Sequence, residues 1–185
     1  MENKKGVSTV VATILIILLS VVAVVVVAGF VVPFVKNNLE ESTECVDYSD
    51  YFYFEEEFGL NCYTTQENGG EFDKRTYAFS VGSKGNKKEL ENGVKGFRVS
   101  MIRQGNAKSI YIENGVEVTG EIKMKDGTGN FELPRIGEVR TYIYVTRDEN
   151  DLFSSLEIYP VLKNDKTCDR SDKISIAGEL CENEI

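Results

Sequence analysis

Histidine is absent from the 185-residue sequence. Its absence excludes the most common general base, the His-containing catalytic triads and the zinc sites that use imidazole. The sequence also lacks a Gly-x-Ser-x-Gly motif and a glycine-rich phosphate-binding loop. Paired carboxylates are the catalytic option that remains, and a secreted hydrolase of that kind is the least favoured interpretation. We therefore predict that the chain is not an enzyme and has no catalytic residue, metal or cofactor.

Charged residues are missing from one long segment, between Gly6 and Val35. With Glu2, Lys4 and Lys5 set aside, the remaining charges are 19 basic and 29 acidic side chains, a net charge of −10. Nucleic-acid phosphates are held by clusters of Lys and Arg, which such an acidic chain does not provide. We therefore expect no nucleic-acid partner.

Cysteine is scarce, and no two cysteines have the two-to-four-residue spacing of a zinc knuckle or a thioredoxin-type motif. The four positions are Cys45, Cys62, Cys168 and Cys181. Two disulfides outside the cytoplasm are the favoured interpretation, and four buried free thiols are the alternative. Three connectivities exist. Closeness in sequence favours Cys45 with Cys62 and Cys168 with Cys181.

The uncharged segment Val7 to Val35 contains 29 residues. As a helix it reaches about 43 Å, which exceeds the ~30 Å hydrocarbon core of a bilayer. The apolar region of a secretory signal is shorter and ends at a small-x-small cleavage site, which is absent after this segment. We expect a membrane-spanning helix that is kept. Because Lys4 and Lys5 precede it and acidic residues follow it, its N-terminus is expected in the cytoplasm and the rest of the chain outside.

Small side chains recur along this segment and allow helices to approach closely. The expected helix-packing residues are Ser8, Ala12, Thr13, Ala23 and Gly29. The alternative is that membrane helices are rich in small residues regardless of packing. Pro33 is expected to loosen the helix near its end.

Lys4, Lys5 and Gly6, followed by Val-Ser-Thr-Val-Val-Ala-Thr-Ile-Leu and a long aliphatic run, resemble the start of archaeal type IV pilin-like proteins, which include pilins and archaellins. The resemblance covers about the first 35 residues and implies a class III signal peptide. A membrane prepilin peptidase would recognise Lys5 and Gly6 and leave Val7 as the mature N-terminus. Thr9 stands where many archaeal pilins have proline, which leaves the subfamily open. The glycine-rich start of archaellins is absent, which favours a pilin or minor pilin.

Beyond Cys45 the apolar pattern has a period of two, which predicts half-buried strands separated by Asn-Gly and Asp-Gly turns. The expected strands are 76–83, 97–105, 108–118, 120–127, 138–147, 154–163 and 172–180. One face of 97–105 contains Phe97, Val99 and Met101. In 138–147 the apolar face contains Val139, Thr141, Ile143 and Val145, opposite Arg140, Tyr142 and Tyr144. The expected fold is α+β, with a long N-terminal hydrophobic helix and an antiparallel, immunoglobulin-like β-sandwich.

Seven of the chain's 19 aromatic residues lie between Cys45 and Tyr63. The favoured interpretation is a strand whose rings pack the domain onto the top of the helix, with Glu55 to Glu57 as a solvated turn, and a sticky surface for other subunits or a host is the alternative. Two acidic segments, around Asp126 and around Asp148 to Asp151, are interpreted as turns; a calcium loop is the alternative for the first.

The predicted organisation is a leader at 1–6, a transmembrane assembly helix at 7–44 and an extracellular β-sandwich domain at 45–185. The predicted function is a structural subunit of a type IV pilus-like filament, with adhesion as a further role. Its expected partners are prepilin peptidase, other pilin subunits and membrane lipid. The alternative function is a membrane-anchored extracellular binding module that does not polymerise.

Overall fold

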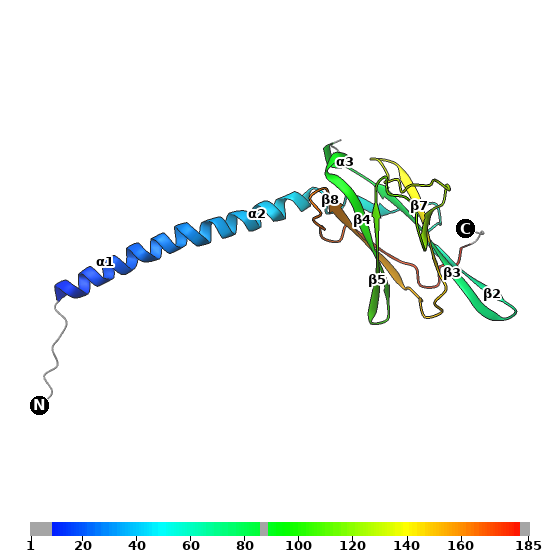
Figure 1. Ribbon diagram of the computed structural model, residues 1–185, viewed down its shortest axis with the longest axis horizontal. Coiled ribbons are helices and arrows are strands. Elements are labelled where there is room, and N and C mark those ends of the chain that lie inside the picture. The colour runs from blue at the N-terminus through cyan, green and yellow to red at the C-terminus, as the bar shows by residue number, and fades with distance from the viewer. Residues whose placement is uncertain (1–8, 86–88, 182–185) are drawn as a thin grey trace, which may run out of the picture. The chain divides into compact units, whose positions relative to one another are not determined.

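The computed structural model describes residues 9–85 and 89–181, apart from the side chains of residues 9, 37–43 and 89. The chain divides into two compact units, Met1–Glu44 and Cys45–Ile185. The described part of the first unit, from Thr9 onward, is one uninterrupted helix (Figure 1). It consists of α1 (Thr9–Val26), the π-helical turn η1 (Val27–Val31) and most of α2 (Val32–Val46).

The π-helical turn lies immediately before Pro33. Proline has no N–H, and in an α-helix its ring meets the carbonyl four residues earlier, here that of Gly29. Within η1 the Val32 N–H donates to the Val27 carbonyl five residues back. This wider turn relieves the crowding at the proline ring. The expected loosening at Pro33 thus takes the form of one π-turn, after which α2 continues to Val46.

The second unit contains two antiparallel sheets (Figure 1). The five-stranded sheet has the order β1-β3-β7-β6, and β2 pairs with the same edge of β3 as β1 does. The four-stranded sheet has the order β5-β4-β8-β9. The elements are β1 (Phe52–Phe54), β2 (Cys62–Asn68), β3 (Glu71–Ser83), α3 (Glu89–Gly93), β4 (Val94–Arg103), β5 (Asn106–Glu113), β6 (Ile122–Met124), β7 (Val139–Thr146), β8 (Ser155–Leu162) and β9 (Asp172–Ser175). The predicted α+β fold with a two-sheet sandwich is confirmed.

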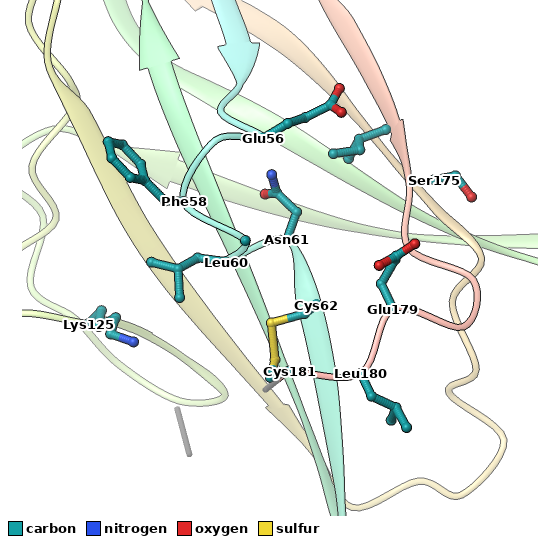
Figure 2. Close-up of a pocket in the computed structure, with 12 residues that line it drawn as sticks. Glu56, Phe58, Leu60, Asn61, Cys62, Lys125, Ser175, Glu179, Leu180 and Cys181 are labelled. Carbon is teal, nitrogen blue, oxygen red and sulfur yellow. A yellow bond between two sulfur atoms is a disulfide. The ribbon is translucent and has the colours of Figure 1, made fainter. Parts of the chain in front are cut away.

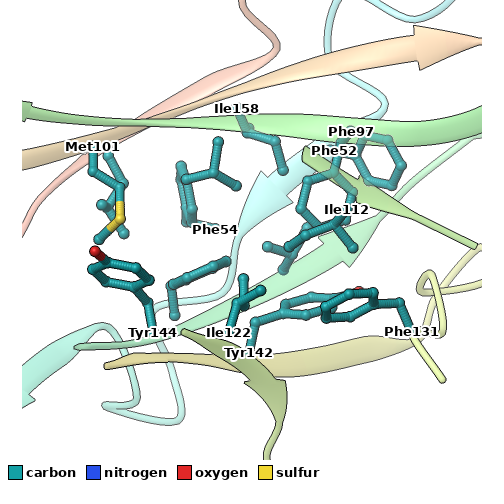
Figure 3. Close-up of a cluster of buried hydrophobic side chains, with 14 of the residues drawn as sticks. Phe52, Phe54, Phe97, Met101, Ile112, Ile122, Phe131, Tyr142, Tyr144 and Ile158 are labelled. Carbon is teal, nitrogen blue, oxygen red and sulfur yellow. The ribbon is translucent and has the colours of Figure 1, made fainter. Parts of the chain in front are cut away.

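The core lies between the two sheets, where aromatic rings meet aliphatic side chains (Figure 3). Phe97, Val99 and Met101 on β4 are fully buried, which confirms the face predicted for that strand. The Phe97 ring lies 5.0 Å from that of Phe52 and 5.3 Å from that of Tyr142, both edge-on. Contacts of this kind join both sheets into one core.

The face predicted for β7 is wrong. Tyr142 and Tyr144 belong to the core cluster, with 0% and 1% exposure, whereas Ile143 points to the opposite face. The tyrosine hydroxyls reach polar atoms at the edge of the core: Tyr142 donates to the Glu132 carbonyl at 2.6 Å and Tyr144 to Glu121 Oε2 at 3.0 Å. A tyrosine can therefore bury a large ring here without losing its hydrogen bond, and its larger apolar area outweighs that of Val or Ile.

The aromatic-rich stretch between Cys45 and Tyr63 mostly packs into the core. Tyr48, Tyr51, Phe52 and Phe54 are at most 8% exposed and belong to the core cluster. Phe58 differs from them, because it is 60% exposed. These four rings are therefore part of the core of the β domain, and packing of the domain onto the top of the helix stays a prediction.

Two disulfides form, as predicted. The pairing favoured by closeness in sequence is wrong. Cys45 is bonded to Cys168, and Cys62 to Cys181. The strand arrangement explains this pairing. The Cys168 N–H donates to Pro160 of β8, and the Cys181 N–H donates to the Tyr63 carbonyl of β2. These hydrogen bonds hold Cys181 beside β2, next to Cys62, and hold Cys168 beside β8.

Candidate functional site

The apolar helix is the largest apolar surface in the described part of the chain. The segment Val10–Lys36 is long and apolar enough to cross a membrane once, and none of it is buried. The exposed fractions of its large apolar side chains run from 46% to 74%. At 1.5 Å per residue the segment is about 40 Å long. Soluble monomers rarely leave so large a continuous apolar surface open to water.

Two hydroxyl groups within this helix are satisfied by its own backbone. Thr13 Oγ1 donates to the Val10 carbonyl at 2.9 Å, and Ser20 Oγ donates to the Ile17 carbonyl at 2.8 Å. A polar group in hydrocarbon is costly unless it is hydrogen-bonded. These two residues therefore place no unsatisfied donor on the surface of the helix.

The small residues do not form one continuous stripe. Ala12 and Ala23 are eleven residues apart, about three helical turns, so they lie on the same face of α1. Gly29 follows Ala23 by six residues and therefore lies on roughly the opposite side. Nothing lies within 4 Å of a Cβ built at Gly29, so the helix is open to a neighbour there. Ser8, like the predicted cleavage residues Lys5, Gly6 and Val7, lies outside the described residues.

Two kinds of surroundings can bury this helix. One is the hydrocarbon of a bilayer, and the other is a bundle of similar helices from other chains. Both suit a surface that lacks charge from Val10 to Val35 and has its hydroxyls internally bonded.

The β domain contains a buried ionic network centred on Asp151, whose side chain is 6% exposed. Arg103 Nη1 donates to its Oδ1 at 2.8 Å, and Thr146 Oγ1 donates to its Oδ2 at 2.8 Å. Lys108 Nζ lies 3.6 Å from Oδ2. The segment does turn as predicted, because Asp148 Oδ1 accepts the Asn150 N–H at 2.9 Å. Sequence reasoning missed the inward direction of Asp151, since nothing in the local sequence distinguishes it from Asp148.

Glu121 and Lys108, which lie beside this network, keep their charges near neutral pH and are therefore not suited to proton transfer. A hydrogen bond from Lys108 lowers the pKa of Glu121, and the Tyr144 hydroxyl acts in the same direction. Burial disfavours the charged form of Lys108, but its hydrogen bonds to Tyr144 and Glu121 raise its pKa on balance. Both side chains therefore stay ionised near neutral pH. The arrangement fits a structural tie between β5 and β7, since a general acid or base would need a pKa nearer to neutrality.

The segment around Asp126 is a turn, as predicted. Asp126 Oδ1 accepts hydrogen bonds from the Thr128 N–H at 3.1 Å and the Thr128 hydroxyl at 2.9 Å. Its pKa is lowered mainly by the backbone hydrogen bond from Thr128. Within the described residues, no three acidic or cysteine side chains are grouped so that they could hold a metal ion.

A surface depression of about 410 Å³ lies beside the Cys62–Cys181 disulfide (Figure 2). Phe58 and Leu180, which are 60% and 65% exposed, line it together with Lys125. The two cysteines that line it are bonded to each other, so neither offers a free thiol. The feature of this depression that bears on binding is the exposed ring of Phe58.

No family model matches the chain, and neither a curated protein nor a solved structure matches it. The resemblance of the first 35 residues to archaeal pilin-like proteins therefore depends on those residues alone.

Proposed function

We propose that this chain is a structural subunit of a type IV pilus-like surface filament, of the pilin or minor pilin kind. One observation carries the proposal: the apolar segment Val10–Lys36, which has no charged residue before Lys36 and no buried part, follows shortly after Lys4, Lys5 and Gly6 in the sequence. Its partners would be prepilin peptidase, membrane lipid and further pilin subunits.

Removal of the basic leader has a physical consequence for the helix. A charged side chain at the centre of a bilayer costs about 2.5 to 3.5 kcal/mol even on insertion scales. With Lys4 and Lys5 attached, the N-terminus is therefore held at the membrane interface. A cut between Gly6 and Val7 removes both lysines, and the remaining helix can leave the bilayer for a filament core with less cost.

The proposed orientation places the N-terminus in the cytoplasm and the β domain outside the cell. Basic residues are retained on the cytoplasmic side of membrane helices, which fits Lys4 and Lys5. Two disulfides support the same orientation, because such bonds persist mainly outside the reducing cytosol.

Cleavage after Gly6 is expected to give a mature chain that begins at Val7. The test is the intact mass and N-terminal sequence of the protein from native membranes and from sheared surface filaments. A Gly6→Phe variant should keep its leader and stay in the membrane. Gly6→Ala should be processed, because the prepilin peptidase of archaeal pilin-like proteins accepts Gly or Ala at this position.

An intact leader on the wild-type chain would contradict the proposal. So would an unchanged mature mass in Gly6→Phe. A processed chain that never enters filaments would instead favour the membrane-anchored binding module.

A further inference from the structure

The outer face of the four-stranded sheet carries a row of two tyrosines around an arginine. Arg98 on β4 is paired in register with Tyr111 on β5 and with Tyr159 on β8. Phe97 and Val99, the neighbours of Arg98, are buried in the core, so Arg98 points away from it. The Arg98 guanidinium carbon lies 5.9 Å from the centre of the Tyr111 ring. We call the outer patch the set Arg98, Tyr111, Glu157, Tyr159, Arg170 and Lys173.

The outer patch is basic, although the domain as a whole is acidic. Arg170 Nη1 lies 2.8 Å and Lys173 Nζ 3.2 Å from Glu157 Oε1, so two cations share one carboxylate. The Tyr159 hydroxyl donates to Glu157 Oε2 at 2.7 Å, and this bond is the main cause of the lowered pKa of Glu157. Glu157 thus stays charged, and Arg98 adds a further positive charge.

Arg98 is not neutralised by any carboxylate within the described residues. Its Nη1 donates a hydrogen bond to Ser109 Oγ at 3.4 Å. Lys95, in the neighbouring part of the sheet, is by contrast paired with Glu113 and Asp165. Arg98 is therefore an exposed cation between two aromatic side chains. This combination is common at the centre of protein interfaces.

A surface of opposite charge lies on the loop between β1 and β2. This loop contains Glu55, Glu56 and Glu57, followed by Phe58. Its base is fixed, because the Glu55 N–H donates to the Ser80 carbonyl at 2.9 Å and Asn61 Nδ2 donates to the Glu55 carbonyl at 2.6 Å. Its tip is open: Glu56 and Glu57 are exposed, and Phe58 is the one aromatic residue classed as exposed among the described residues of the β domain. A fixed loop that presents an aromatic side chain loses little entropy on binding.

We propose that the β1–β2 loop of one copy of this chain docks on the outer patch of another copy. Phe58 packs against the tyrosine row, and the carboxylates of Glu56 and Glu57 pair with Arg98 and Arg170. A second copy is the occupant because every copy carries both complementary surfaces. Within the described residues of a single copy, no ion pair joins the loop glutamates to the patch.

Such a contact joins two different surfaces, so each copy offers one free loop and one free patch to further copies. Contacts of this heterologous kind build either closed rings or open filaments. The inference concerns the β domains and goes beyond the proposed function, which concerns the helix. It does not require cleavage of the leader.

The test uses full-length protein in detergent micelles and measures self-association by sedimentation and by chemical cross-linking. Arg98→Glu alone and Glu56→Arg with Glu57→Arg are each expected to weaken self-association at least tenfold. When the two variants are mixed, the unchanged acidic loop of Arg98→Glu meets the unchanged basic patch of the loop variant, so association between the two variants should return to near the wild-type level. Arg147→Glu, an exposed arginine outside the patch, makes the same charge change and should have no effect.

Self-association of Arg98→Glu equal to that of Arg147→Glu would overturn the proposal, and so would a mixture that does not recover. Thermal unfolding of each variant separates loss of contact from loss of fold. Since neither measurement depends on the N-terminus of the mature chain, failure of this inference is distinguishable from failure of the proposed function.

Discussion

Reduction of both disulfides is expected to lower the free energy of unfolding of the β domain by about 8.5 kcal/mol. Cys45–Cys168 spans 123 residues of chain, and a loop of that length contributes about 4.9 kcal/mol in the chain-entropy model. With this bond in place, Cys62–Cys181 closes a circuit of only about 30 residues, through segments 45–62 and 168–181, and contributes about 3.6 kcal/mol more. A typical domain is stable by only about 5 to 15 kcal/mol, so the reduced domain should be close to unfolding.

The measurement is chemical denaturation of the full-length chain in detergent, with and without reductant, followed by tyrosine fluorescence because the sequence has no tryptophan. Cys45→Ala with Cys168→Ala removes one bond and should cost about 3.6 kcal/mol. As a control for connectivity, Cys45→Ala with Cys62→Ala removes one partner from each bond. That variant should expose two titratable thiols, and a variant without free thiols would show that the pairing is different.

Replacing Asp151 by alanine is expected to lower the free energy of unfolding by about 3 to 5 kcal/mol. The side chain is 6% exposed and accepts hydrogen bonds from Arg103 and Thr146. Its loss leaves the Thr146 hydroxyl, in a residue 2% exposed, without that acceptor and leaves Arg103 and Lys108 without a shared anion. Removing one partner of a buried ion pair is costly because the other charges stay in place uncompensated.

Denaturation midpoints of Asp151→Ala and Asp151→Asn, measured beside wild type, test this expectation. Asparagine keeps the shape and a hydrogen-bond acceptor but loses the charge, so its effect should be intermediate. Asp148→Ala is the matched control, since Asp148 lies in the same segment, is exposed and bonds only within its turn. Equal losses for Asp148→Ala and Asp151→Ala would show that the buried network does not stabilise the domain.

The features that sequence could predict are those set by local pattern. An uncharged run as long as Val7 to Val35 predicts a helix that can span a membrane, because the pattern needs no knowledge of distant residues. The alternation around Phe97 likewise predicts the buried face of β4. In β7 the same rule failed, because both faces of the strand offer large side chains and the choice depended on hydrogen-bond partners for Tyr142 and Tyr144 that come from other segments.

Pairings between distant residues could not be predicted. The disulfides depend on how β2 and β8 lie relative to the C-terminal segment, so closeness in sequence was a poor guide. The surroundings of Asp151 and Arg98 could not be predicted for the same reason. One is buried by a network drawn from three strands, and the other acquires its tyrosine neighbours through strand register. The predicted packing residues of the helix remain predictions, since their partners would belong to other chains.

The Cys45–Cys168 bond also determines how the domain would respond to mechanical tension. Cys45 lies in the last turns of α2, and Cys168 is hydrogen-bonded to Pro160 of β8, a strand with a neighbour on each side. A pull along α2 therefore enters the domain by two covalent routes, through the main chain into β1 and through the sulfur atoms to the segment beside β8. Because the force is shared in this way, the three-residue strand β1 cannot be unzipped from β3 until the segment at Cys168 is also pulled away from β8.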